Sequence, residues 1–135
     1  WTNGAATIAP GGNFTITADS VLTAKWTAIN YTISYNSDGG TDAPAQITKQ
    51  IGQSHTVGSA VTKPGYNFAG WSNGSSVVGP GATIVTGASD ITYTAQWSPK
   101  VYQVSYDWNG GRGTAENDVA YTFGNPAITL PRAGH

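Results

Sequence analysis

Few side chains in this chain are of the types that bind metals or carry out acid–base chemistry. Among its 135 residues are seven acidic residues, two histidines and no cysteine. Asp38, Asp42 and Asp107 lie close to Gly-rich turns, where carboxylates could converge on Ca²⁺, a cation that takes about six to eight oxygen ligands. No second aspartate accompanies Asp107 as Asp42 accompanies Asp38, so we interpret these aspartates as turn-stabilising residues.

The remaining reactive residues form no catalytic constellation in the sequence. His55 and His135 have no Cys or carboxylate cluster nearby and occupy no equivalent positions. No serine is in the strand–turn–helix context of a nucleophile elbow. The Gly-Gly pairs at 11–12, 39–40 and 110–111 lack the lysine and helix of a phosphate-binding loop. We therefore predict a protein that is not an enzyme and has no cofactor or metal.

Composition restricts the partners and the location. The net charge is −1 and only 10% of residues are charged, which argues against nucleic acid as a partner. No stretch is apolar enough for direct membrane insertion. Abundant Thr, Ser, Asn and Gly without Cys or Met is typical of secreted β-rich stalks, and predicts an extracellular or cell-surface location. Asn13, Asn30 and Asn73 open N-glycosylation sequons, for which chance is the better explanation in so polar a sequence.

The elements that position these residues repeat with a period of about seventy residues, which is the signature of a tandem array. Three segments recur at an offset of 70 or 71: WTNG at 1–4 as WSNG at 71–74, LTAKW at 22–26 as YTAQW at 93–97, and YTISY at 31–35 as YQVSY at 102–106. Arrays of small modules extend, bear load or display more often than they catalyse.

The repeat divides the chain into three parts. Residues 31–97 form one complete repeat, 1–26 the C-terminal half of a preceding repeat, and 102–135 the N-terminal half of a following one. Linkers at 27–30 and 98–101 are short and predict semi-rigid spacing, the second stiffened by a proline. Because both outer parts are incomplete, we interpret the chain as a fragment of a longer protein.

Periodicity predicts a mainly β fold, α+β at most, with very little helix. The segment Ile91–Trp97 alternates most clearly, and Tyr31–Tyr35 also alternates as a half-buried strand. A second strand is expected through Ile47–Ile51. In the segment before Trp71, alternation places Tyr66, Phe68 and Gly70 on one face.

Punctuation of the chain adds turns and leaves little room for helix. Asp38-Gly39 and Asn109-Gly110 are dipeptides typical of tight hairpin turns. At most one short helical turn fits, within 53–63 or 87–90.

Aromatic residues supply the predicted core, since the chain has no disulfide. Trp71 and Trp97 recur as Trp1 and Trp26, which favours packing over a sugar-stacking role. Trp108 has no aromatic counterpart in the complete repeat and precedes a turn, so we expect it to be exposed and name it the candidate ligand-binding residue. The predicted structural core is Tyr35, Tyr66, Phe68, Trp71, Ile91, Tyr93 and Trp97.

The complete repeat resembles a known family. A Tyr-x-Ile-x-Tyr strand followed by Gly-Gly, then PGYNFAGW at 64–71 and ITYTAQW at 91–97, is similar to the Listeria/Bacteroides repeat, the B-repeat of internalin-type surface proteins. The resemblance implies small β-grasp-like modules in tandem within long extracellular proteins of bacteria and some archaea, among them adhesin stalks. It carries over no catalytic residue. Two positions depart from the pattern: His135 replaces the tyrosine found at Tyr66, and Trp108 stands where the complete repeat has Ser37.

Three functions are open at this point. The first is a stalk or spacer of a secreted or cell-surface protein with a role in cell adhesion, whose partners are neighbouring repeats. The second is a subunit of an extracellular filament, in which the two half-repeats of identical chains pair head to tail by strand complementation. The third is a module that binds a glycan or a host or matrix protein, with Trp108 as the contact.

Overall fold

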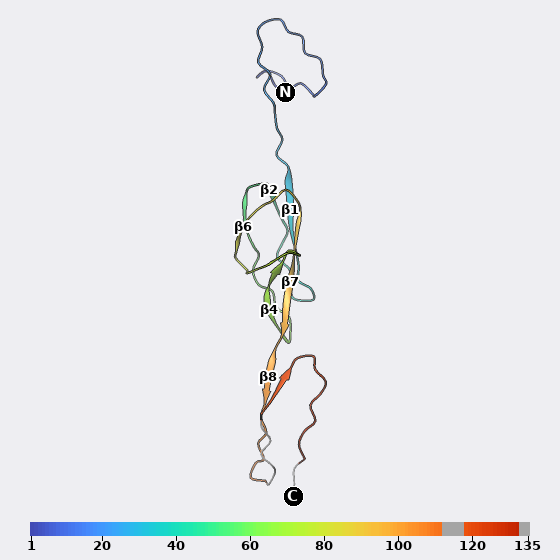
Figure 1. Cartoon of the computed structure of the whole chain (residues 1–135), viewed down its shortest axis with the longest axis vertical. Coiled ribbons are helices and arrows are strands. Elements are labelled where there is room, and N and C mark those ends of the chain that lie inside the picture. The colour runs from blue at the N-terminus through green and yellow to red at the C-terminus, as the bar shows by residue number, and fades with distance from the viewer. Residues whose placement is uncertain (112–117, 133–135) are drawn as a thin grey trace.

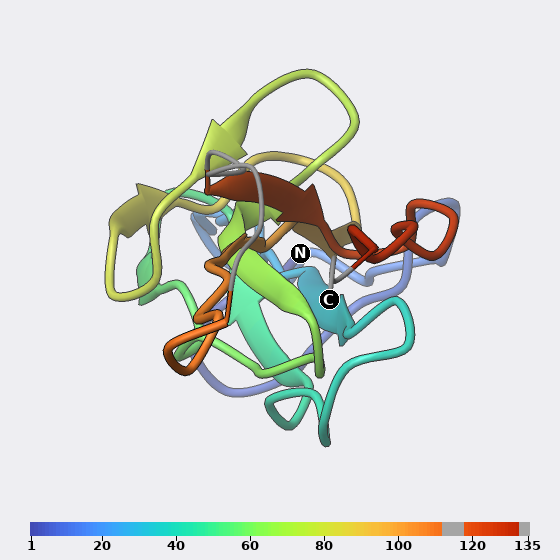
Figure 2. The same cartoon turned by 90° about the horizontal axis from the view of Figure 1, so that it is seen from below.

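The computed structural model describes residues 1–111 and 118–132, which contain nine β-strands and no helix. Figure 1 shows them along one long axis, with the N-terminal segment at the top, β1–β7 in the middle and β8–β9 at the bottom. Viewed along that axis in Figure 2, the three parts overlap around a common centre. The predicted mainly β class is confirmed, whereas the short helical turn is absent from the described residues, and part of its expected range is a strand.

The middle part, which we call the central module, is built on a five-stranded sheet of order β2-β1-β7-β4-β5. Its strands are β1 (Asn30–Asn36), β2 (Ile47–Gln50), β4 (Tyr66–Ser72), β5 (Val77–Val78) and β7 (Ile91–Pro99). Two further pairs are β3 (Ser54–Thr56) with β6 (Thr83–Val85), and β8 (Val101–Val104) with β9 (Val119–Thr122).

Strand β7 is the middle strand of the five, with two strands on either side. It lies parallel to β1, with Ile33 opposite Ile91, and antiparallel to β4. Its Thr and Gln residues alternate with Tyr93 and Ala95, which are buried as period-two alternation predicts. The core of the central module consists of Ile33, Val57, Val61, Trp71, Tyr93 and Ala95, with two of its members on the segment that crosses from β3 to β4.

Strand β4 contains a bulge that the alternation did not predict. The register against β7 shifts between Phe68 and Gly70, where β4 has one residue more than β7. From this point on, the side chains of β4 face the opposite side from the one that strict alternation predicts. Trp71 therefore points to the same side as Phe68, with the ring centroids 5.3 Å apart, and is completely buried. Gly70 permits this with φ +131°, and a Cβ there would lie 2.6 Å from a methyl group of Val77. Our expectation of one face for Tyr66, Phe68 and Gly70 is thus wrong beyond Phe68.

The predicted turns are present in the structure, whereas the predicted linker at 98–101 is not. Asp38 and Gly39 have φ of +47° and +81°, and Asn109 and Gly110 have +46° and +79°, so both dipeptides form the predicted tight turns. The segment 98–101, in contrast, is hardly a linker. β7 continues to Pro99 by pairing with β4, and β8 begins after a single intervening residue.

Candidate functional site

The N-terminal segment keeps the strand pairing of the back half of the central module. The backbone N–H groups of Thr2 and Thr23 each donate to the other residue's carbonyl oxygen at 2.8 Å. One repeat further on, the equivalent residues Ser72 and Thr94 face each other between β4 and β7. The repeat is therefore visible in the backbone of this segment as well as in its sequence.

A second pair of contacts extends the equivalence. Ile8 donates its backbone N–H to the Trp1 carbonyl at 2.8 Å, as expected for the counterpart of the Trp71–Val78 pair between β4 and β5. A bridge between Thr2 and Thr7 has its counterpart in Ser72 facing Val77.

The C-terminal hairpin likewise reproduces the front half. In the central module Ile33 faces Ile47 and Asn30 faces Gln50. In β8–β9 the corresponding pairs are Val104 with Val119 and Val101 with Thr122. The two ends of the described chain thus carry the β4–β5–β7 pattern and the β1–β2 pattern of one repeat.

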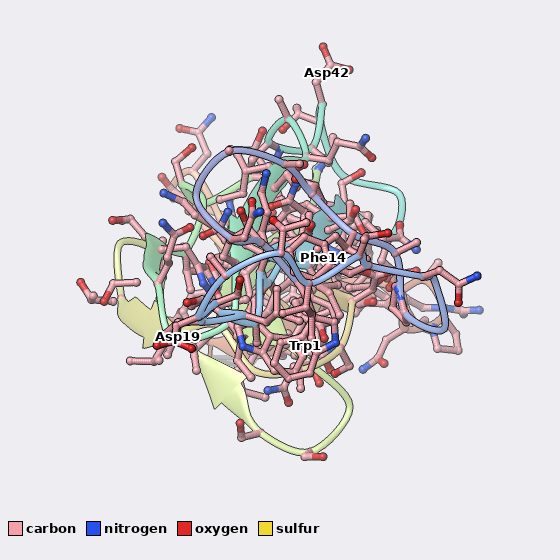
Figure 3. All side chains as sticks on the ribbon, turned by 90° about the horizontal axis from the view of Figure 1, so that it is seen from above. Trp1, Phe14, Asp19 and Asp42 are labelled. Carbon is pink, nitrogen blue, oxygen red and sulfur yellow. The ribbon has the colours of Figure 1, made fainter. Side chains whose placement is uncertain are left out.

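In the part of the chain that the structure describes, each half-repeat leaves open the face that the central module buries. In the N-terminal segment, a hollow of about 280 Å³ is lined by residues that include Trp1, Ile8, Gly12, Phe14 and Leu22. Their counterparts in the central module are Trp71, Val78, Ala82, Ile84 and Tyr93, all of which are in the core or pack against it. Figure 3 shows Trp1 and Phe14 at this end of the molecule. Trp1 is 51% exposed where Trp71 is fully buried.

An adjoining hollow extends the same apolar face. It measures about 390 Å³ and is lined by Trp1, Pro10, Ala24, Lys25 and Trp26. Ala24 and Trp26 correspond to Ala95 of the core and to Trp97, which packs against it.

The C-terminal part has the complementary hollow, and Trp108 lies in it. This hollow of about 360 Å³ is lined by Ser105, Tyr106, Asp107, Trp108, Leu130 and Pro131. Tyr106 and Leu130 correspond to Tyr35 and Val61 of the central module. Trp108 is partly buried rather than exposed as we expected, because it shares this hollow with Tyr106 and Leu130. The freely exposed tryptophans are Trp1 and Trp26.

Most of the predicted core residues surround Trp71. The Tyr35 ring lies 5.1 Å from Trp71 and 5.6 Å from Tyr93 between centroids, and Phe68 lies 5.6 Å from Trp97. Tyr93 is fully buried, and Tyr35, Phe68, Ile91 and Trp97 pack partly buried against the core.

The polar atoms of these aromatic residues have partners. The Trp71 Nε1–H donates to the Gly58 carbonyl at 3.0 Å, and the Tyr35 hydroxyl accepts from the Gly58 N–H at 2.9 Å. Tyr66 differs from the other predicted core residues, since it packs against Phe123 of the C-terminal part. The hydrogen bonds of Trp71 and Tyr35 fit a packing role, since a buried Trp N–H or Tyr O–H group usually has a hydrogen-bond partner.

His55 is a buried structural histidine, a role that we did not predict for it. It is 4% exposed, its Nδ1 lies 3.1 Å from Thr86 Oγ1, and its Nε2 lies 3.4 Å from the Tyr93 hydroxyl. Burial, with a smaller contribution from Lys49, lowers the pKa of His55 below 6.5, so the ring is held neutral. Burial also raises the pKa of Tyr93, with a smaller contribution from Tyr35. The sequence signal for this burial is the spacing of His55 and Val57, which lie two residues apart as do neighbours on one face of an extended segment. His135 lies outside the described residues.

The aspartates have separate local roles. Asp107 accepts the Asn109 N–H at 2.8 Å in its turn, whereas Asp42 projects outward in Figure 3. Asp38 offers its backbone carbonyl to Lys63 Nζ at 3.0 Å. Within residues 1–111 and 118–132, no three His, Asp or Glu side chains are close enough to hold a metal ion. Sequence reasoning missed Asp90, whose carboxylate accepts the Thr32 N–H at 2.7 Å and so ties β1 to the start of β7.

One motif match also escaped the sequence analysis. Residues 70–74 read GWSNG, which has the Gly-x-Ser-x-Gly spacing of a nucleophile elbow. Ser72 ends β4, and the turn after it leads into β5 instead of a helix. Its hydroxyl accepts the Gly74 N–H at 3.2 Å, which is a turn contact.

These observations define a class of protein: tandem arrays of small β modules without disulfides. Residues 31–96 match the family model of the Listeria-Bacteroides repeat domain, and the central module belongs to that family. The resemblance drawn from the sequence is confirmed over these residues. The part of the chain that the structure describes contains no helix suited to crossing a membrane.

Two relatives come from Evansella cellulosilytica. One, named "Putative Gly-rich membrane protein", is 31% identical over 121 residues, which cover 84% of this chain and 14% of the relative. The other, named "Putative membrane protein", is 31% identical over 116 residues, which cover 84% of this chain and 17% of the relative. The chain therefore spans only a small part of either protein. No solved structure matches it significantly.

Proposed function

We propose that the central module is a load-bearing spacer in a cell-surface protein. The observation that carries the proposal is the parallel pairing of β1, where the chain enters the module, with β7, where it leaves. Membership in the Listeria-Bacteroides repeat family and the names of the two relatives support a surface setting. A stalk of such modules would hold another domain at a distance from the cell surface, and this reach would serve adhesion.

The parallel pair explains how the module would resist tension. Force applied at the two ends of the module pulls β1 and β7 in opposite directions along their length. The ladder from Ile33–Ile91 to Asn36–Thr94 is then loaded in shear, and its hydrogen bonds must break together. The bond from the Thr32 N–H to the Asp90 carboxylate lies beside the same ladder and adds to it. In a peeling geometry the bonds would break one after another at lower force.

The strand order supports a β-grasp-like interpretation of the same module. The first and the last long strand lie parallel at the centre, with β2 on the far side of β1 and β4–β5 on the far side of β7. The segment that contains β3 occupies the connection where a β-grasp carries its helix. Such a layout places the entry and exit of each repeat at opposite ends, as a spacer needs.

Single-molecule force spectroscopy tests the proposal. The complete chain would be stretched from its two ends and compared with a variant stretched through cysteines at Ile29→Cys and Ser89→Cys. The native sequence has no cysteine, and both positions are exposed beside the same ends of β1 and β7. We expect a clearly higher rupture force in the first geometry, because forced unfolding follows the unfolding barrier in the direction pulled. Equal forces would contradict a load-bearing role.

A second candidate function, the filament, is favoured by the open faces of the half-repeats. The hollows beside Trp1 are lined by back-half core positions, and the hollow beside Tyr106 by front-half core positions. By the register of the central module, residues 104–107 of one chain would pair in parallel with residues 20–23 of another. The composite core would place Tyr106 against Leu22 and Trp1. Each chain then has one acceptor face and one donor face, which produces open head-to-tail assembly.

Two variants make this assembly testable by sedimentation velocity. Leu22→Asp spoils the acceptor face and Tyr106→Asp spoils the donor face, while each leaves the other face intact. We expect concentration-dependent oligomers of the native chain and monomers of each variant alone. A mixture of the two variants should form dimers and stop there. A native chain that stays monomeric at all concentrations would contradict the filament, and unaltered association of the variants would exclude these faces.

A further inference from the structure

The boundary between the central module and the C-terminal hairpin is a packed contact. The ring of Phe123, directly after β9, lies edge-on to the ring of Tyr66 at the start of β4, with centroids 5.3 Å apart and planes at 75°. Phe123 also covers Gly65, so that a Cβ on Gly65 would overlap the phenyl ring. Residues far apart in sequence thus hold two successive repeats together.

The backbone reinforces this contact on both sides of the single residue between β7 and β8. Lys100 donates its N–H to the Gly65 carbonyl at 2.9 Å, and its own carbonyl accepts the Phe123 N–H at 2.8 Å. Lys100 is therefore bonded to the central module through one backbone group and to the next repeat through the other. On the module side, Lys63 Nζ lies 4.9 Å from the centre of the Tyr66 ring, a cation–π distance that restrains the ring.

The equivalent position of the preceding boundary lacks such a cover among the described residues. Ile51 follows β2 as Phe123 follows β9, and it is 60% exposed. Ile29, the counterpart of Lys100, is 64% exposed. Both isoleucines flank the Asn30–Gln50 pair at the end of the β1–β2 ladder. At the second boundary the cover comes from the Gly65–Tyr66 pair, which lies five to six residues before Trp71.

We propose that Gly65, Tyr66, Lys100 and Phe123 form an inter-repeat lock, which fixes the orientation of each repeat on the one before it. The partner of the apolar residue after the second strand of a repeat is the glycine–aromatic pair of the preceding repeat. Ile51 is accordingly the surface on which such a pair would dock. The lock extends the spacer proposal, since it concerns stiffness between modules and leaves the shear resistance within a module unchanged.

Distance measurements between spin labels test the lock in the complete chain. Labels at Thr48→Cys on β2 and Ala120→Cys on β9 are both exposed and lie on opposite sides of the boundary. We expect a narrow distance distribution in the labelled parent chain. Phe123→Ala should replace it with a broad one, while Ile51→Ala, which removes the exposed equivalent, should leave it narrow.

Glycine variants supply a second, matched comparison. Gly65 and Gly52 have φ of +80° and +78°, so an alanine at either position carries similar backbone strain. Only Gly65→Ala also clashes with Phe123, since the Gly52 position has open space. We expect broadening for Gly65→Ala and none for Gly52→Ala.

The outcomes separate the lock from the spacer. An unchanged distribution in Phe123→Ala would overturn the lock even if Gly65→Ala misfolds, because Phe123 lies outside the central module. Phe123→Ala should leave the rupture force of that module unaltered, so failure of the lock and failure of the load-bearing proposal give different results.

Discussion

The central module and the N-terminal segment carry the same sequence pattern and the same backbone bridges, yet only one of them has a core. Trp71 is fully buried, whereas Trp1, one repeat earlier, is 51% exposed. Tyr93 is fully buried, whereas its counterpart Leu22 is 40% exposed. The backbone pairing of the back half is therefore local, since it forms without the front half. Burial is not local, because it needs the strand β1 and the crossing segment that supply Ile33, Val57 and Val61.

The C-terminal hairpin teaches the same lesson from the other side. β8 and β9 pair in the register of β1 and β2, but Val104, the counterpart of the fully buried Ile33, is only partly buried. A two-stranded hairpin is marginal in water without a second layer. In repeat proteins, each unit buries its apolar face only against the rest of the array. The two half-repeats therefore leave exposed an apolar face that the complete repeat buries within itself.

The largest expected effect concerns the two equivalent tryptophans. Trp71→Ala should lower the free energy of unfolding by about 3–5 kcal/mol, because it leaves a cavity in the core and removes the hydrogen bond to Gly58. Trp1→Ala should change it by no more than about 0.5 kcal/mol, as expected for an exposed side chain. Urea denaturation of both variants of the complete chain, followed by circular dichroism, measures the difference.

The Trp1 variant is also the control for the comparison itself. If Trp1→Ala destabilised the chain as strongly as Trp71→Ala, Trp1 would be buried in solution. The N-terminal hollow would then be filled, and repeating the measurement at several protein concentrations would show whether a second copy fills it.

The next largest effect is expected at Gly40 of the central module, compared with its counterpart in the C-terminal part. A Cβ on Gly40 would lie 2.6 Å from the Trp97 ring and 2.9 Å from the Thr62 carbonyl. Gly40→Ala should therefore cost about 1–3 kcal/mol by overpacking. At Gly111, its counterpart in the C-terminal part, a Cβ would meet, among the described residues, just the Trp108 carbonyl at 3.0 Å, so Gly111→Ala should cost less. Thermal melts of the two variants would contradict this account if the order were reversed.

Much of the fold was accessible from sequence because local chemistry determines it. Asp38-Gly39 requires a turn with positive φ, and the alternation of Ile91–Trp97 requires a strand with one buried face. The expected second strand at Ile47–Ile51 appears as Ile47–Gln50. The bulge before Trp71 was not accessible, since it arises from the tertiary fit of Gly70 against Val77. The parallel partnership of β1 and β7 also depends on contacts across some sixty residues.

The candidate site was less accessible than the fold. Sequence comparison identified the two half-repeats, but exposure depends on what lies opposite each residue. Trp108 was expected to be exposed and is partly buried beside Tyr106, whereas Trp1 and Trp26 were read as core positions and are exposed. Phe123 was not predicted as a site residue because its contact with Tyr66 joins two repeats, and no equivalent contact occurs elsewhere among the described residues.

Acid should distinguish the central module from the half-repeats, since the described part of the N-terminal segment has no buried histidine. His55 is neutral in the folded state because burial lowers its pKa below 6.5. The unfolded chain therefore takes up the proton first as the pH falls, and stability should decline below about pH 6.5 and level off below the folded-state pKa. Each unit of pKa lowering corresponds to about 1.4 kcal/mol.

The matched variant for this prediction is His55→Gln. Its amide can approach Thr86 or Tyr93 but takes up no proton in this range, so the decline between pH 7 and pH 5 should flatten. Urea titrations at several pH values measure both profiles. A native profile that is flat, or a variant profile with the same slope, would show that His55 does not set the acid sensitivity.

The smallest expected effect is at Trp26, and it tests whether the half-repeat is open in solution. Trp26 is 89% exposed, whereas Trp97, its counterpart, is partly buried, packs against Phe68 and donates its Nε1–H to the Ser37 carbonyl at 3.1 Å. Trp26→Ala should therefore change the free energy of unfolding by no more than about 0.5 kcal/mol. It should nevertheless shift the fluorescence of the folded chain to shorter wavelength and reduce quenching by acrylamide, because it removes the tryptophan most accessible to water. Trp97→Ala should instead destabilise the central module. If Trp26→Ala left both the emission and the quenching unchanged, Trp26 would be covered in solution, and the open face seen in the structure would be occupied by a partner.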